Sequence, residues 1–333
     1  MSSSKGISSE LVSEFKTSRR SIIPFLIAVV GVSIILLFVL KFASDNNTTE
    51  SDLPDTEITS LQFNGQNFPT LRLGHYALWA VDSTDKSHFL KRFNSVGGSL
   101  VSLNGEKLET WDVTLPQDIT KFNITLEREG DRNEEPNEFL LFSADALYSD
   151  TSFSSTFENP TFDPTVEPKG SFILATPTDG NSKINEASGV WLIRKDRNTP
   201  SLSLPEIDSA QWVWQTRLVS NSGTTLLLGD FRKPDEADNS SKYSQTKASG
   251  FRAPGEDLLK NLPEGLTGPI NLANGSQTLI VSLEPHIDGI DFTGELIFLE
   301  VLRAEIPLNL KPGSPVELEN TLKPLKLVLS TSS

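Results

Sequence analysis

Residues 122–127 read Phe-Asn-Ile-Thr-Leu-Glu, and residues 279–284 read Leu-Ile-Val-Ser-Leu-Glu. In the first hexapeptide apolar and polar side chains alternate, which is the period-two pattern of a strand with one buried face. Similar short apolar or alternating runs, separated by Gly, Pro, Asn and Asp, continue through most of the chain beyond residue 57. The pattern predicts a mainly β protein. Outside any membrane segment, a helical turn or two is expected only at residues 255–260.

The two hexapeptides are the last of three anchors that occur twice in the same order. Tyr76 aligns with Trp212, each inside an aromatic strand, and Phe93 aligns with Phe231. The interval from the first anchor to the second is similar in the two halves of the chain. Alternation is generic, so any two β-rich segments align to some extent. Three colinear anchors favour a duplicated domain, with the polar stretch 234–262 as an insertion in the second half.

The anchors predict two tandem β-sandwich-like domains. We expect domain one at residues 58–179 and domain two at residues 185–330, with the break in the turn-rich stretch 176–187. In this interpretation Leu126 and Leu283 are buried in their own cores. Glu127 and Glu284 follow them directly, so they point to the opposite face and are expected to matter less.

The N-terminal part of the chain predicts a membrane anchor. No charged side chain occurs from Ile22 to Leu40, and at ~1.5 Å per residue this run spans the hydrocarbon core of a bilayer. A cleaved signal peptide would have a shorter apolar region followed by a small-x-small site. We therefore expect a transmembrane helix at residues 21–41, so the membrane is a predicted partner of the chain.

The charges on either side of the helix predict its direction. Lys5, Lys16, Arg19 and Arg20 precede it, whereas acidic residues dominate after Lys41. The positive-inside rule predicts a short cytoplasmic tail at residues 1–20, followed beyond the helix by a flexible stalk at residues 42–57 and the extracytoplasmic domains. The expected localisation is the cell membrane, single-pass, with the N-terminus in the cytoplasm.

Composition narrows the classes of partner. Beyond residue 41 the chain has 24 Lys+Arg against 42 Asp+Glu, a formal charge of −18. Such a surface repels nucleic acid, so no nucleic-acid partner is expected. The chain has no cysteine, which excludes thiol catalysis and thiolate metal sites, and domains of this size need no disulfides.

The aromatic strand 76–79, Phe93 and the Leu126-Glu127 strand are arranged as in a known family. A second set of motifs, Leu-Leu-Gly-Asp-Phe at 227–231 and Val-Ser-Leu-Glu-Pro at 281–285, matches better. Together they resemble the extracytoplasmic domain of the anti-sigma-K factor family, over roughly residues 60–310. The resemblance implies a β fold and a regulatory role. Members of that family bind a sigma factor through a cytoplasmic helical domain, which a tail of about twenty residues without Cys or His does not provide.

Candidate chemistry is sparse. The only histidines, His75, His88 and His286, do not occupy matched positions and lie near no nucleophile motif. The acidic loops 127–135 and 284–291 are rich in oxygen ligands but lack the spacing of an EF-hand. We therefore predict no catalytic, cofactor-binding or metal-binding residues and no cofactor.

The five tryptophans could form a sugar-binding face if they were exposed, but core packing is their ordinary role. They are Trp79, Trp111, Trp191, Trp212 and Trp214.

Three functions remain open. The first is a regulatory or sensing module, similar to an anti-sigma factor and without catalytic activity, that binds an unidentified protein. The second is a structural or adhesive surface protein that uses its β domains as spacers. The third and most remote is an envelope hydrolase.

Overall fold

The computed structural model describes residues 60–116, 118–137, 139–149, 152–158, 165–180, 183–194, 196, 199–246, 252–287, 290–293, 296–323 and 325–331. The expected cytoplasmic tail, membrane helix and stalk lie outside these residues. Within them, no helix has both the length and the apolar character that crossing a bilayer requires.

The prediction of a mainly β protein is confirmed, with 47% of the structure in strands. The helices of the described residues are two 3-10 turns, η1 at Pro177–Asp179 and η2 at Glu186–Ser188. The helical turn expected near residue 255 is wrong. Gly255–Asp257 is strand β14, because its backbone pairs with strand β11 at Gly189–Trp191.

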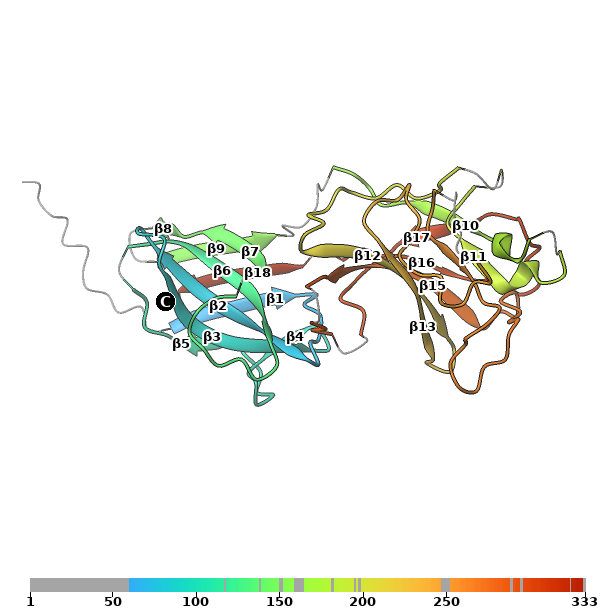
Figure 1. Cartoon of the computed structure of the whole chain (residues 1–333). Coiled ribbons are helices and arrows are strands. Elements are labelled where there is room, and N and C mark those ends of the chain that lie inside the picture. The colour runs from blue at the N-terminus through green and yellow to red at the C-terminus, as the bar shows by residue number, and fades with distance from the viewer. Residues whose placement is uncertain are drawn as a thin grey trace, which may run out of the picture. The chain divides into compact units, whose positions relative to one another are not determined.

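Two five-stranded sheets, shown in Figure 1, contain most of the N-terminal half. The first has the order β5-β1-β18-β9-β8, with bounds Thr110–Asp112, Ser60–Gln66, Lys326–Thr331, Ser152–Glu158 and Leu147–Ser149. The second has the order β4-β3-β2-β6-β7, with bounds Ser99–Val101, Ser87–Val96, Gly74–Asp82, Ile119–Arg128 and Leu140–Asp145.

Aromatic side chains pack these two sheets against each other. Phe63 on β1 lies 6.2 Å from Phe93 on β3 and 3.8 Å from Trp111 on β5, between ring centroids. Tyr76 on β2 stacks on Phe93 at 5.2 Å. All four side chains are buried, so apolar burial holds the two layers together.

The third sheet has eight strands in the order β13-β12-β15-β16-β17-β10-β11-β14. Those not yet given have the bounds Thr225–Phe231 (β13), Trp212–Ser220 (β12), Gln277–Pro285 (β15), Leu299–Glu305 (β16), Val316–Asn320 (β17) and Gly170–Leu174 (β10).

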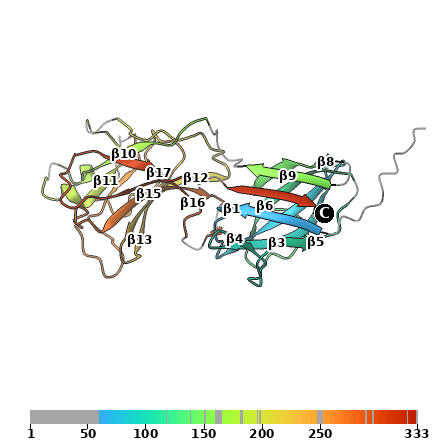
Figure 2. The same cartoon turned by 180° about the vertical axis from the view of Figure 1, so that it is seen from behind.

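Strand pairing corrects the predicted domain boundaries at two places. Residues 170–174, assigned to domain one, form β10 and pair with β17 and β11 of the eight-stranded sheet. Residues 326–331, assigned mainly to domain two, form β18, which lies between β1 and β9 (Figure 2). The apolar alternation at 325–329 predicts a strand correctly, but pairing with β1 depends on contacts far away in the sequence.

Two sets of four strands repeat one arrangement. The first repeat is β3-β2-β6-β7 and the second repeat is β13-β12-β15-β16. In each repeat, an aromatic residue on a central strand lies opposite one core residue on each neighbouring strand, and we call these three residues a triad. The triads are Tyr76, Phe93 and Leu126, and Trp214, Phe231 and Leu283.

The strand register corrects one predicted anchor. The residue of the second repeat that is equivalent to Tyr76 is Trp214, whereas the sequence predicts Trp212. Phe231 follows Trp214 at the same interval at which Phe93 follows Tyr76. Trp212 instead lies at the contact between the two repeats, with its ring centroid 5.1 Å from Phe139 and 5.5 Å from Phe298.

The irregularities of the ladders also repeat. The β2–β3 and β12–β13 ladders shift register after Leu78 and Thr216. The β6–β7 and β15–β16 ladders shift after Ile124 and Val281. Each pair of positions is equivalent when the triads are superposed. A bulge bends a strand and re-aims its side chains, so the two repeats bend at the same places.

Candidate functional site

The glutamates that follow Leu126 and Leu283 are buried, although the sequence predicts that they matter less than the leucines. Glu127 is 3% exposed and Glu284 is 5% exposed. They do point away from the leucines, but β6 and β15 have buried residues on both faces near these positions. We call the face that carries the glutamates the outer face of each repeat.

On the outer face of the first repeat, neutral groups hold Glu127. The Thr125 hydroxyl donates to its Oε1, and the Asn137 amide lies 3.4 Å from the same oxygen. The indole of Trp79 donates to Thr125 Oγ1 at 2.8 Å. Glu127 thereby anchors the loop between β6 and β7.

The second repeat holds its glutamate with a cation. The Arg217 guanidinium, at the position equivalent to Trp79, lies 3.5 Å from Glu284 Oε1. Ser282 Oγ donates to the same oxygen at 2.6 Å, and the Phe298 amide donates to Oε2 at 3.1 Å. Arg217 Nε also donates to Gln215 Oε1. Again the carboxylate anchors the loop to the next strand.

Burial shifts the pKa of these groups. It raises the pKa of Glu284 to about 7, although the Arg217 charge lowers it. Burial also raises the pKa of Glu127, against a hydrogen bond from Thr125. Opposite Glu127 in the ladder lies His75, whose pKa is lowered to about 4 by burial and then by the charge of Arg92.

The insertion 234–262 forms the most polar buried region among the described residues of the second repeat. Its residues Asp238 and Asn239, which we call the clasp, join the two edge strands of the eight-stranded sheet. The Asn239 amide donates to Asp230 O on β13 at 2.8 Å, and Asn239 Oδ1 accepts from Asp230 N at 3.0 Å. Asp238 Oδ2 accepts from Gly255 N on β14 at 2.8 Å.

Glycine makes this close approach possible. A Cβ at position 229 would lie 2.6 Å from the Asp238 carboxyl carbon. A Cβ at position 255 would lie 2.5 Å from the Trp191 ring, and one at position 189 would lie 2.0 Å from Ala175 O. Three strands therefore leave room for the clasp and its neighbours.

Two further carboxylates follow Gly255 on β14, one on each face of the strand, and we call them and Asp238 the carboxyl cluster. Asp257 is fully buried and accepts from Trp191 Nε1 at 2.7 Å and Thr178 N at 2.8 Å. Glu256 is also fully buried and accepts from Tyr243 N at 3.1 Å through Oε1. Its Oε2 has no hydrogen-bond partner within the described residues.

The carboxyl cluster has raised pKa values. Burial raises the pKa of Asp238 to about 7, and the negative charges of Glu256 and Asp230 add to the rise. Burial raises the pKa of Asp257 to about 6. It also raises the pKa of Glu256, although the nearby Ser244 and Ser240 hydroxyls lower it. Burial thus disfavours the charged form of the fully buried Glu256 and Asp257 and of the half-buried Asp238.

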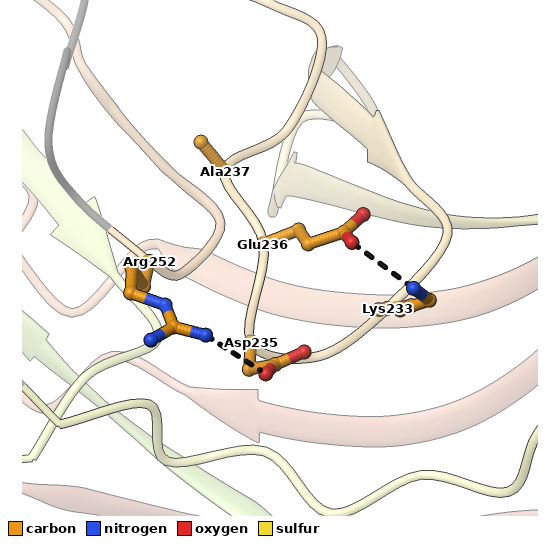
Figure 3. A pocket seen from close by; sticks show the side chains of 5 residues that line it. All are labelled: Lys233, Asp235, Glu236, Ala237 and Arg252. Atoms are coloured by element: carbon orange, nitrogen blue, oxygen red, sulfur yellow. Dashed lines mark ion pairs between the residues drawn. The ribbon is translucent and has the colours of Figure 1, made fainter.

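The surface of the insertion has a shallow depression, shown in Figure 3, with a volume of about 400 Å³. Its charged residues form two ion pairs, Lys233 with Glu236 at 3.3 Å and Arg252 with Asp235 at 3.5 Å. All four side chains are largely open to solvent. The depression thus offers charges of both signs from one segment.

The residues singled out from the sequence do not come together. His88 pairs with Asp82 at 2.8 Å in the β2–β3 hairpin. In the acidic loop of the first repeat, Asp131 and Asn133 cap backbone amides two residues on. The described residues contain no group of three His, Asp or Glu arranged for a metal ion. All five tryptophans are buried, which confirms the expectation of core packing.

Sequence reasoning did not find the clasp or the carboxyl cluster. Their signal is the acidic run at the ends of the insertion, at 235–238 and 256–257. Acidic residues in a polar stretch are usually solvated, so only the structure distinguishes them. Comparisons of this chain with protein-family models, with curated proteins and with solved structures give no match.

Proposed function

We propose that this chain is a single-pass membrane protein whose exterior part is a non-catalytic binding or sensing module. In this proposal residues 21–41 anchor it, residues 1–20 face the cytoplasm and the two repeats descend from one duplicated β-sandwich-like domain. The motifs that resemble anti-sigma factors support a regulatory role. The proposed partner is an unidentified protein that binds the exterior part.

One observation carries the proposal: only one of the two repeats has the elaborated insertion. The segment between Phe231 and Leu283 is much longer than the equivalent segment between Phe93 and Leu126. The extra chain is fastened by buried carboxylates and presents a charged surface between positions 233 and 252. A charged connecting segment carried by a β-sheet scaffold is typical of a recognition element. We therefore assign partner recognition to the insertion.

The pairing of β1 with β18 favours this function over a spacer. Leu61 lies opposite Thr331 in the ladder, so the chain enters and leaves the described region on neighbouring strands. A force between residues 60 and 331 would load the β1–β18 ladder and bypass the second repeat. A serial spacer needs its load to pass through each domain in turn.

Photo-crosslinking tests the recognition role. A photoreactive amino acid is placed at Glu236 in the full-length chain, in membranes of cells that naturally produce it, and a matched one at Asp85 in the β2–β3 turn. We expect a specific crosslinked partner from position 236 alone, and its loss in Lys233→Glu/Arg252→Glu. Equal products from positions 236 and 85, or products unaffected by the charge reversal, would contradict the proposal.

Protease protection tests the topology. In right-side-out vesicles, added protease is expected to digest residues 42–333 and to spare an N-terminal peptide. Recovery of the full-length chain in the soluble fraction after lysis would rule out the anchor.

A further inference from the structure

We propose that protons bound by the carboxyl cluster keep the clasp closed in acid, and that loss of these protons opens it as the pH rises to neutrality. This inference concerns regulation of the recognition element and so rests on the proposed function. Its geometry is independent of that function.

The clasp is the connection that protonation would control. Asp238 and Asn239 reach both edge strands of the eight-stranded sheet, and the segment 232–254 connects those edges in sequence. Backbone amides of three segments depend on the cluster. They belong to Gly255, Tyr243 and Thr178. Loss of these contacts would loosen residues 238–246 against β14 and η1, while the β11–β14 and β12–β15–β16 ladders remain intact.

The surroundings of the cluster contain donors but little positive charge. Backbone amides, hydroxyls and the Trp191 indole donate to the three carboxyls. The charged groups that act on two of them are also acidic. Glu256 and Asp230 on β13 act on Asp238, and Asp179 on η1 acts on Asp257.

The nearby cations of the insertion are engaged elsewhere. Lys242 lies over the Tyr243 ring at 5.1 Å, Lys260 donates to Gln245 O at 3.0 Å, and Arg252 pairs with Asp235. Ionising Asp238 and Glu256 together would therefore place two like charges next to each other, with neither paired to these cations.

The burial of Glu256 supports the proposal independently of the charges around the cluster. Its side chain is completely buried and its Oε2 has no hydrogen-bond partner within the described residues. A buried carboxylate oxygen without a donor is costly when ionised, and a proton on that oxygen removes the charge. The structure thus contains a place for a bound proton inside the cluster.

The sign of the effect follows from linkage. The closed state raises the carboxyl pKa values, Asp238 to about 7 and Asp257 to about 6, so it binds protons more tightly than the open state. The closed state is then most favoured below the ordinary carboxyl pKa, and it loses its advantage as the pH rises from that value to the raised pKa of each group. One such group changes the closed-to-open ratio about tenfold per pH unit in that window.

Hydrogen exchange of the full-length chain in detergent micelles measures this opening. Protection factors, which remove the intrinsic pH dependence of exchange, are compared at pH 5.5 and pH 8 for the amides of residues 238–246 and of Gly255. We expect protection to fall at least tenfold across this range, while β2 and β6 remain protected. Constant protection in the insertion would overturn the proposal.

A variant with one carboxyl of the cluster made neutral tests whether the cluster causes the pH dependence of protection. Glu256→Gln keeps the acceptor for Tyr243 N and puts a donor at the unpartnered oxygen, so it should reduce the pH dependence at least threefold. Asp238→Asn is the second variant, in case the first does not fold, and Asp235→Asn, an exposed carboxyl of the same insertion, is the control. An unchanged pH dependence in a folded cluster variant, or an equal reduction in the control, would overturn the proposal.

The test separates this inference from the proposed function, since exchange needs no partner. Normal opening without a crosslinked partner would contradict recognition alone. A crosslinked partner with pH-independent protection would contradict the clasp alone.

Discussion

The outer faces of the two repeats bury the same glutamate with different neighbours. Glu127 has the Thr125 hydroxyl and, behind it, the Trp79 indole. Glu284 has Ser282 and, at the position of Trp79, the charged Arg217. In both repeats a backbone amide of the loop to the next strand donates a hydrogen bond to the glutamate. The comparison shows that the shared task is to hold that loop, and that an apolar ring or a cation can cover the same carboxyl.

This difference determines how much stability each outer face loses when one of its polar side chains is substituted. A neutral network loses single hydrogen bonds when one member is removed, whereas a buried ion pair leaves an uncompensated charge. We therefore expect the second repeat to be the more sensitive of the two on its outer face.

Arg217→Met should have the largest effect, because it leaves Glu284 buried without its cation. We expect a loss of about 3–5 kcal/mol in the free energy of unfolding, measured by urea denaturation of the chain in detergent. The control is Arg303→Met, whose ion pair with Glu300 is partly exposed and should contribute less than about 1 kcal/mol. Equal losses in the two variants would mean that the Arg217 pair is no more important than a surface contact.

The core faces should respond alike, since Leu126 and Leu283 occupy equivalent places and are both fully buried. Leu126→Ala and Leu283→Ala should each cost about 2–5 kcal/mol, measured in the same denaturation experiment. Leu227→Ala, at a side chain that is 45% exposed, is the matched control and should cost much less. A small loss at only one of the two leucines would break the equivalence of the repeats.

The variant Glu284→Gln tests whether the buried glutamate of the second repeat makes stability depend on pH. The folded pKa of Glu284 is raised to about 7, so the wild type loses stability as pH rises from the ordinary glutamate value through 7. The Tm of the Gln variant, relative to the wild type, should therefore increase between pH 4.5 and pH 8, as thermal unfolding at several pH values will measure. A Tm difference that does not change with pH would show that Glu284 titrates normally.

The smallest effect is expected at Trp79→Phe, which removes the indole donor to Thr125. We expect a cost of about 1 kcal/mol beyond the loss of ring area. Trp111→Phe is the control, because Trp111 Nε1 has no hydrogen-bond partner within the described residues. Equal costs in the two variants would mean that the bond to Thr125 contributes nothing measurable.

Part of the repeat could be predicted from the sequence. The interval between Tyr76 and Phe93 recurs unchanged between Trp214 and Phe231, and it marks a hairpin of constant length. Aligning the first aromatic residue of each strand selects Trp212 as the anchor instead. Register depends on which residue faces the core, and two aromatic residues two positions apart share a face, so the pattern by itself does not distinguish them.

The burial of the glutamates could not be predicted in the same way. Alternation correctly places Leu126 and Glu127 on opposite faces, but it does not say whether the second face is covered. Trp79, Thr125 and the loop at Asn137 cover it, and they come from three separate segments.

The sequence by itself determined the elements that depend on neighbouring residues. Alternating side chains specify the strands, and the turn between β2 and β3 closes with the Asp82 carboxylate capping the Thr84 amide at 2.8 Å. The hairpin of the second repeat closes at the equivalent place, with Ser220 Oγ accepting from the Thr224 amide at 3.0 Å. Such contacts span a few residues, so the local sequence is enough to specify them.

Only the tertiary structure decided where distant segments meet. β18 could extend the sheet nearest in sequence, yet it pairs with β1, at the opposite end of the described chain. The clasp joins β13 to β14, and Asp257 meets Thr178 and Trp191 from a distant part of the sequence. An edge strand accepts any strand that can reach it. Side-chain packing and hydrogen bonding in the whole fold, rather than local pattern, therefore choose the partner.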